Sequence, residues 1–181
     1  MAHVILGLLL IAPMSLYDLI KAFDQGISLF YSASSGSIKR ALDGLLAKGH
    51  IEIVSVDKGS RGRKTYGVTP AGKDAFRTWM NGPIEESNLD TAALSRIHFL
   101  GHLPADERLQ ILERVRTRIE SDLVTLEQVE SVASATEYPE HMSELVRYGR
   151  ATLDYGLMAN RAALEWVEDF LRRERESTGK L

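Results

Sequence analysis

The sequence contains no cysteine among its 181 residues. This absence excludes disulfide scaffolds, thiolate metal sites and cysteine nucleophiles, and it fits a reducing compartment. No hydrophobic run is long enough to cross a bilayer, because the longest one extends only from Val4 to Met14. That run has neither the basic leader nor the cleavage site of a signal peptide. We therefore expect a soluble protein of the cytoplasm.

The chain also lacks a strong net charge, which is −3 at pH 7. This average conceals two halves of opposite sign. Residues 1–83 contain ten Lys and Arg against six Asp and Glu, whereas residues 84–181 contain twelve against nineteen. A basic half joined to an acidic half indicates that one part binds a polyanion and the other has a different role. We expect two domains with these bounds.

The first domain begins with helices that carry clear start signals. Ser15 and Asp18 have the spacing of a capping box, which predicts an amphipathic helix that ends near Gly26. Serines at positions 34, 35 and 37 precede a further helix, which Gly49 closes. Together with the apolar opening segment, these signals predict three helices in the first fifty residues.

A change of period follows. Residues 51–56 and 66–68 are rich in β-branched side chains and predict a hairpin with a charged tip. Thr69 and Pro70 supply an N-cap and a first-turn proline for a fourth helix. The order helix, helix, helix, hairpin, helix is that of a winged helix-turn-helix domain. The fold class is therefore mainly α, with this domain at the N-terminus.

The second domain contains three predicted helices, over residues 89–101, from Pro104 to about residue 135, and from Pro139 to about Arg175. The last would be roughly 55 Å long, too long for an eighty-residue domain to cover. Its apolar stripe repeats at intervals near 3.5 residues, which favours helix pairing and a second subunit. We expect an antiparallel helical dimerisation domain that uses Met142, Leu145, Gly149, Leu153, Leu157, Leu164, Val167 and Leu171.

The strongest candidate site is a DNA-binding surface on the third helix and the hairpin tip. The polar residues at the start of such a helix contact base edges and phosphates. Seven cations against three acids lie between Ser34 and Lys64, which favours DNA over the alternative of a solvated helix and a charged turn. The candidates are Ser35, Ser37, Lys39, Arg40, Arg61, Arg63 and Lys64.

An aromatic line offers a second candidate site. Trp79, Tyr148, Tyr155 and Trp166 could form a pocket for a flat aromatic effector. Aromatic side chains are equally common in a hydrophobic core or a protein interface, and we favour such packing over a ligand pocket.

No arrangement of residues indicates an enzyme. Residues 59–65 lack the Gly-Lys-Thr sequence of a phosphate-binding loop, and they lie in a hairpin. His98 and His102 have a metal-ligand spacing, but no acidic third ligand stands beside them. We expect no catalytic residues, no cofactor and no metal.

The head-domain motifs resemble those of PadR-type transcriptional regulators, in the longer subclass with an extended helical C-terminal region. The carrying segments are residues 15–20, 37–42, 45–51 and 66–69, with Gly72 and Trp79. Tyr17, in the first segment, joins the DNA-binding candidates. One departure is Lys39, which stands where family members commonly carry Tyr or His.

The resemblance implies a homodimeric repressor that binds operator DNA and answers to small molecules such as phenolic acids or drugs. The alternative is a winged-helix module for protein–protein interaction, in which the acidic helical half recruits a partner. The cations on the third helix and hairpin favour DNA binding.

Overall fold

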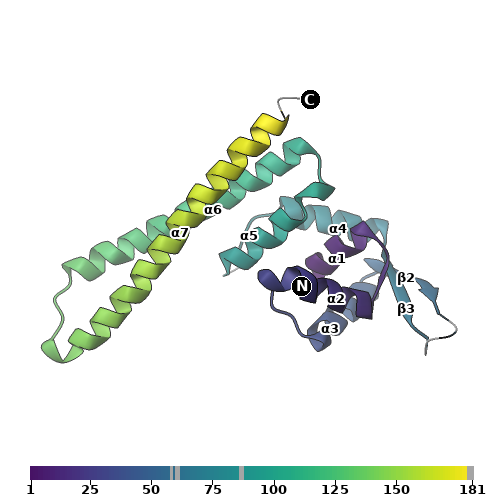
Figure 1. The fold of residues 1–181 in the computed structure, drawn as a ribbon, viewed down its shortest axis with the longest axis horizontal. Coiled ribbons are helices and arrows are strands. Elements are labelled where there is room, and N and C mark those ends of the chain that lie inside the picture. Colours follow the sequence, from purple (N-terminus) through teal and green to yellow (C-terminus); the bar gives the residue numbers. More distant parts are fainter. Residues whose placement is uncertain (58, 60–61, 86–87, 179–181) are drawn as a thin grey trace. The chain divides into compact units, whose positions relative to one another are not determined.

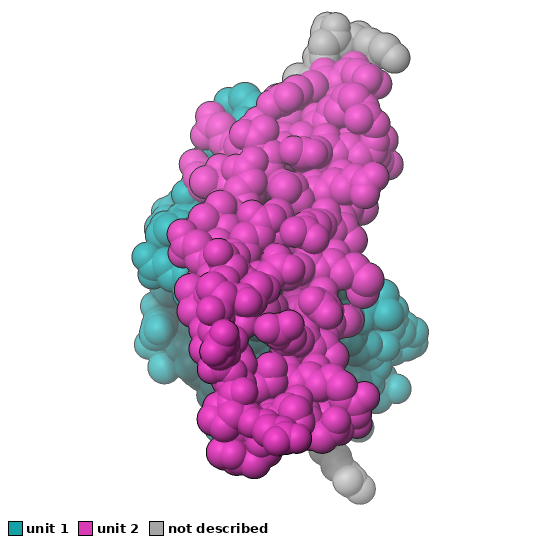
Figure 2. All heavy atoms as spheres, turned by 90° about the vertical axis from the view of Figure 1, so that its left-hand side faces the viewer, with its two compact units in different colours: residues 1–107 teal, residues 108–181 magenta. Residues whose placement is uncertain are grey.

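The computed structural model describes residues 1–57, 59, 62–85 and 88–178. The chain forms two compact units, Met1–Glu107 and Arg108–Leu181 (Figures 1 and 2). The first unit contains the predicted winged helix-turn-helix, so the predicted fold class is confirmed. Its four principal helices are α1 (Ala2–Ile11), α2 (Leu16–Gln25), α3 (Ser35–Ala47) and α4 (Pro70–Asn81).

The predicted start signals of these helices are confirmed. Ser15 and Asp18 form a reciprocal capping box at the start of α2. Ser34 and Ser37 form a second one at the start of α3. The Thr69 side chain caps α4 by accepting from the backbone three residues on. Each cap satisfies backbone donors that have no partner within the helix, and so fixes where the helix begins.

A three-stranded antiparallel sheet adds one strand to the predicted hairpin. The order is β1 (Met14–Ser15), β3 (Lys64–Val68), β2 (Ile51–Val56). The wing is the hairpin of β2 and β3 with the loop between them. In β1, Met14 pairs with Tyr66 and Ser15 with Thr65. The end of β3 nearest the wing loop is thereby joined to Ser15, the residue that caps α2.

A bulge interrupts the wing ladder. Ile53 pairs with Tyr66, whereas Ser55 pairs with Thr65, so Val54 is the extra residue. A Cβ added to Gly67 would lie 2.7 Å from the Val54 side chain. Glycine at this position of β3 therefore leaves the space that the bulged valine occupies.

The first unit continues beyond the hairpin and α4 into α5 (Leu89–His98) and a 3-10 turn, η2 (Leu100–His102). The Phe99 ring packs against Gly7 of α1, where an added Cβ would lie 2.8 Å from it. Nε2 of His102 lies 3.1 Å from the Gly7 carbonyl oxygen. These contacts place residues after 83 in the same compact unit, while a division of roles at residue 83 stays a prediction.

The second unit consists mainly of two long helices. These are α6 (Ala105–Ala135), whose first residues belong to the first unit, and α7 (Ser143–Thr178), which follows a short 3-10 turn, η3 (Glu140–Met142). Ion pairs join Arg161 to Glu127 and Arg175 to Glu113, so α7 runs antiparallel to α6 (Figure 1). Within the described residues, no helix is both long and apolar enough to cross a membrane.

Two helical glycines have opposite surroundings, which gives a stability prediction. At Gly72 of α4, an added Cβ would lie 2.0 Å from the His50 carbonyl oxygen, whereas at Gly44 of α3 it would meet nothing within 4 Å. We expect Gly72→Ala to lower the free energy of unfolding by about 1–3 kcal/mol or more, because backbone must move. Gly44→Ala should raise it by about 0.5–1 kcal/mol through helix propensity.

Urea unfolding followed by circular dichroism measures both changes, with the two variants as mutual controls. Equal shifts of the midpoint in the same direction would contradict the close approach of α4 to the hairpin.

Candidate nucleic-acid interface

Two serines in the first turn of α3, Ser35 and Ser37, differ in whether their hydroxyl groups take part in the helix cap. Ser37 donates its hydroxyl to the Ser34 carbonyl at 2.7 Å and accepts from the Ser34 N–H at 2.9 Å. Its hydroxyl is therefore engaged in the cap, while Ser35 is exposed. A phosphate contact by Ser35 needs no rearrangement, whereas one by Ser37 would compete with the cap.

Lys39 and Arg40 project from the exposed face of α3, opposite the buried Ile38 and Leu42. The Lys39 ammonium donates to Asp43 at 2.7 Å, one turn later. This hydrogen bond and the charge of Asp43 raise the pKa of Lys39. Lys39 therefore remains fully cationic at neutral pH, and its pairing with Asp43 aligns it along the helix.

The wing contributes Arg63 and Lys64, both exposed, at the point where the loop enters β3. The two ends of the wing loop are joined by a hydrogen bond, in which the Asp57 N–H donates to the Arg63 carbonyl at 2.9 Å. Arg61, the third cation predicted for this site, lies outside the described residues.

Arg63 is held against the start of α2. Its Nη2 donates to both carboxylate oxygens of Asp18 at 2.8 Å. Its guanidinium carbon lies 5.9 Å from the ring centroid of Tyr17, whose side chain is exposed. Hydrogen bonds from Ser15 and then from Arg63 lower the pKa of Asp18. The carboxylate is therefore ionised throughout the neutral range, as the ion pair requires.

Tyr66 of β3 lies where the wing meets the start of α2. It lines a hollow of about 230 Å³ together with Tyr17, Arg63 and Lys64. The structure thus brings Tyr17 together with the wing cations Arg63 and Lys64 around one hollow.

Three residues of this surface were not singled out from the sequence as binding candidates. Asp18 was assigned only a capping role, because its contact with Arg63 spans 45 positions and leaves no local pattern. Tyr66 served only as a strand residue. Lys21 is exposed on α2 one turn after Tyr17, and the polar face of that amphipathic helix could have identified it.

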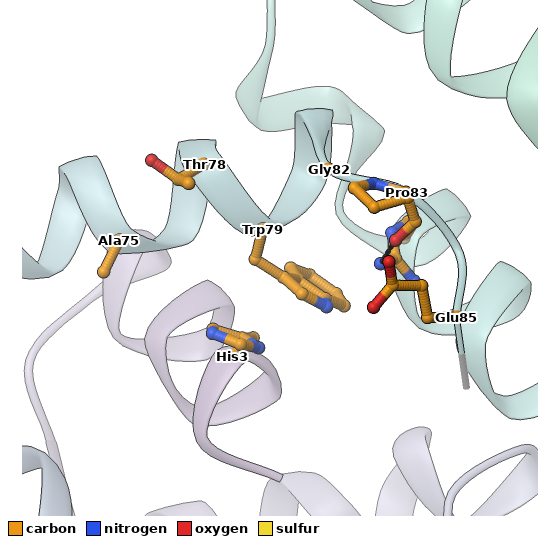
Figure 3. Close-up of a pocket in the computed structure, with 8 residues that line it drawn as sticks. His3, Ala75, Thr78, Trp79, Gly82, Pro83 and Glu85 are labelled. Atoms are coloured by element: carbon orange, nitrogen blue, oxygen red, sulfur yellow. Dashed lines mark hydrogen bonds between the residues drawn. The ribbon is translucent and has the colours of Figure 1, made fainter.

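Trp79 lines a separate cavity of about 680 Å³ in the first unit. The His3 ring of α1 stacks on the indole with centroids 4.9 Å apart, as Figure 3 shows. The Arg96 guanidinium lies 4.7 Å from the same ring centroid. Arg96 is 2% exposed and donates to the carbonyls of Ala92 and Pro83. The cavity wall therefore combines aromatic faces with a buried cation.

The other three predicted pocket residues lie in the second unit and on its surface. Tyr148, Tyr155 and Trp166 of α7 are 62%, 68% and 44% exposed. With Leu145, also exposed, they repeat at steps of three, seven and eleven residues, which is one face of a helix with a near 3.5-residue repeat. We call Leu145, Tyr148, Tyr155 and Trp166 the exposed seam.

The predicted dimerisation stripe is divided by the structure. Leu157, Val167 and Leu171 are buried within a single chain, and Leu153, Leu164 and Met142 are half-buried. Leu145 and Gly149 are exposed. The buried members therefore pack within the chain itself, whereas Leu145 and Gly149 are the solvent-exposed members of the stripe.

Both histidines of the pair are exposed, and their rings lie against the buried Phe99 ring. His98 lies edge-on to Phe99, with ring centroids 4.8 Å apart, and partial burial, followed by the nearby His102, lowers the pKa of His98. Among the residues that the structure describes, no three His, Asp or Glu side chains gather in a geometry that could hold a metal ion.

Comparisons with known proteins follow the two halves of the chain. Residues 5–78, from α1 into α4, match the model described as transcriptional regulator PadR-like family. Residues 92–173 match the model described as virulence activator alpha C-term. No curated protein matches the chain.

Several solved structures are similar. Bacillus subtilis PadR in complex with operator DNA has 24% identity and a TM-score of 0.44, with 96% of this chain and 98% of that chain covered. The structure of the same protein in complex with p-coumaric acid has 23% sequence identity and a TM-score of 0.42, and the match covers 96% of this chain and 94% of that chain. The Vibrio cholerae virulence activator AphA has 20% sequence identity and a TM-score of 0.41, and the match covers 97% of this chain and 98% of that chain.

The two family models account for both the winged helix-turn-helix and the paired C-terminal helices. The segments from which the resemblance was predicted, residues 15–20, 37–42, 45–51 and 66–69, lie inside the first match together with Gly72, and Trp79 lies one residue beyond it. The chain therefore carries an N-terminal domain of the transcriptional regulator PadR-like family, followed by a domain of the virulence activator alpha C-term family.

Proposed function

We propose that the protein is a homodimeric, ligand-responsive repressor that binds operator DNA through α3 and the wing. One observation carries the DNA-binding part. One compact unit presents exposed side chains from three neighbouring elements. These are Tyr17 on α2, Lys39 and Arg40 on α3, and Arg63 and Lys64 on the wing.

The geometry suits the established mode of winged helix-turn-helix binding. The first turns of α3 would enter the major groove, where Arg40 and Lys39 can donate to guanine N7 and O6. The wing cations and Tyr17 would contact phosphates, which position the protein without specifying sequence. Repression requires only that the bound dimer occupies DNA needed by RNA polymerase. A cytoplasmic location stays a prediction from the sequence.

We infer that the exposed seam is the dimer contact. Apolar side chains repeated at near 3.5-residue steps on a long helix are typical of a helix-pairing surface. Leaving them in water is unfavourable, and large exposed apolar patches mark interaction sites. A second copy of α7 supplies a surface of the same shape, as a twofold interface requires.

We infer that the cavity beside Trp79 is the effector site. Its aromatic walls suit a small aromatic molecule, and the buried Arg96 supplies a polar handle. Effector binding can weaken repression only if the ligand prefers the dimer state that binds DNA poorly.

The DNA-binding proposal predicts different effects for α3 and the wing. Arg40→Ala should weaken binding to the operator by about 1–3 kcal/mol per lost base contact and change random DNA little. Lys64→Ala should weaken all duplexes alike and lower the salt slope by about one per lost phosphate contact in each subunit. Fluorescence anisotropy with the upstream intergenic DNA, at several salt concentrations, measures both.

Lys73→Ala on α4 is the matched control, because it removes the same charge outside α2, α3 and the wing. Failure of the wild-type protein to bind any duplex, together with salt-insensitive binding to a protein, would support the interaction module instead.

The dimer proposal predicts that Tyr155→Arg yields monomers, because a cation on the exposed seam would be buried without a partner. Asp154→Arg, at the adjacent exposed position, should remain dimeric. Sedimentation velocity at micromolar concentration separates the two species. A wild-type monomer, or a Tyr155→Arg dimer of unchanged affinity, would contradict this interface.

The effector proposal predicts that an aromatic ligand changes the fluorescence of Trp79. In Trp166→Phe, Trp79 is the sole tryptophan, so titration with p-coumaric acid reports on its cavity alone. We expect operator affinity to fall by about 5- to 150-fold at saturation. A ligand that quenches Trp79 but leaves operator affinity unchanged would show binding without regulation.

A further inference from the structure

Asp18 connects two parts of the first unit that are distant in sequence. Its Oδ2 accepts from the Ser15 N–H at 3.0 Å and from the Ser15 hydroxyl at 2.7 Å. Both of its oxygens also accept from Nη2 of Arg63 at 2.8 Å. One carboxylate therefore closes the cap of α2 and fixes the side chain at the end of the wing loop.

The contact uses only part of the Arg63 guanidinium. An arginine has five N–H donors, and only Nη2 donates to Asp18, with one N–H shared between the two carboxylate oxygens. Among the described residues, Nε and Nη1 of Arg63 have no hydrogen-bond partner, and the side chain is 46% exposed. The unused donors can therefore bind a second oxyanion while the first contact is kept.

A place for that oxyanion lies beside the same side chain. The hollow of about 230 Å³ is lined by Tyr17 from α2 and by Arg63, Lys64 and Tyr66 from the wing. Two cations and two phenol groups at one small hollow provide the donors that a phosphate prefers.

We propose that Asp18 is a positioning residue, which holds Arg63 in the orientation that binds a DNA phosphate at this hollow. The proposal rests on the function proposed above and adds a residue that does not itself touch DNA. Its ion pair is too exposed to matter much for folding, because pairs of this kind contribute little to stability. Its effect on binding arises from preorganisation, since a long side chain that is already ordered loses less entropy on binding.

The direction of the change in DNA affinity distinguishes two roles for Asp18, which are to position Arg63 or only to repel the DNA phosphates. Removing an acid near DNA reduces repulsion of phosphate, so simple electrostatics predicts tighter binding by Asp18→Asn. If Asp18 instead positions Arg63, the same substitution weakens binding. Asparagine keeps a side-chain oxygen that can accept from Ser15, so the cap of α2 can persist.

The test measures duplex affinity against salt concentration for the full chain. The variants are Asp18→Asn, Arg63→Gln, the double variant and Asp24→Asn, which removes an exposed acid from the same helix. We expect Asp18→Asn to bind about 3- to 10-fold more weakly than wild type, with a smaller salt slope. We expect no further loss when Asp18→Asn is added to Arg63→Gln, and no loss from Asp24→Asn. Urea midpoints confirm that each variant is folded.

Each outcome of this test supports or overturns the positioning role of Asp18. Unchanged or tighter binding by Asp18→Asn overturns the positioning role while leaving DNA binding intact. An equal loss in the Arg63→Gln background also overturns it, because the effect then passes through α2 and not through Arg63. A wild-type chain that binds no duplex overturns both this proposal and the proposed function.

Discussion

The first unit depends on a helix that has no exposed stripe. Six consecutive residues of α1, Val4–Leu9, are buried, so neighbours must cover the helix on every side. Helices α2, α3 and α4 and strand β3 supply this cover, and the Phe99 ring closes the gap at Gly7. Helix α3 and the wing therefore pack against one common element, which fixes the surface they present together.

Helix α7 carries two lines of apolar side chains that share one period. Leu157, Val167 and Leu171 are buried within the chain, while Leu145, Tyr148, Tyr155 and Trp166 follow a second line that remains exposed. Both lines repeat at steps close to 3.5 residues, so the period alone indicates that the helix packs and leaves open which line serves which neighbour. Burial separates them, and it assigns the aromatic line to the surface of a single chain.

Sequence patterns predicted the elements whose causes are local. The cap at Ser15, the capping box of Ser34 and Ser37 and the Thr69-Pro70 start of α4 each act within one helical turn, so adjacent residues identify them. Strand β1 was missed because two residues carry no period. The contact between Asp18 and Arg63 and the packing of Phe99 on Gly7 were missed because each joins distant positions. The binding candidates on α3 were predicted from helix position, whereas the companions that orient them required the fold.

The bulge in the wing has a consequence for how the protein behaves when concentrated. In the part of the chain that the structure describes, strand β2 has a neighbouring strand on one side only, and Ile53, Val54 and Val56 are exposed along it. An open strand with apolar side chains is a template on which another chain can add a strand and start an aggregate. The extra residue at Val54 breaks the even spacing of backbone donors and acceptors that such an addition needs. The irregularity that Gly67 makes room for thus protects the wing from pairing with other wings.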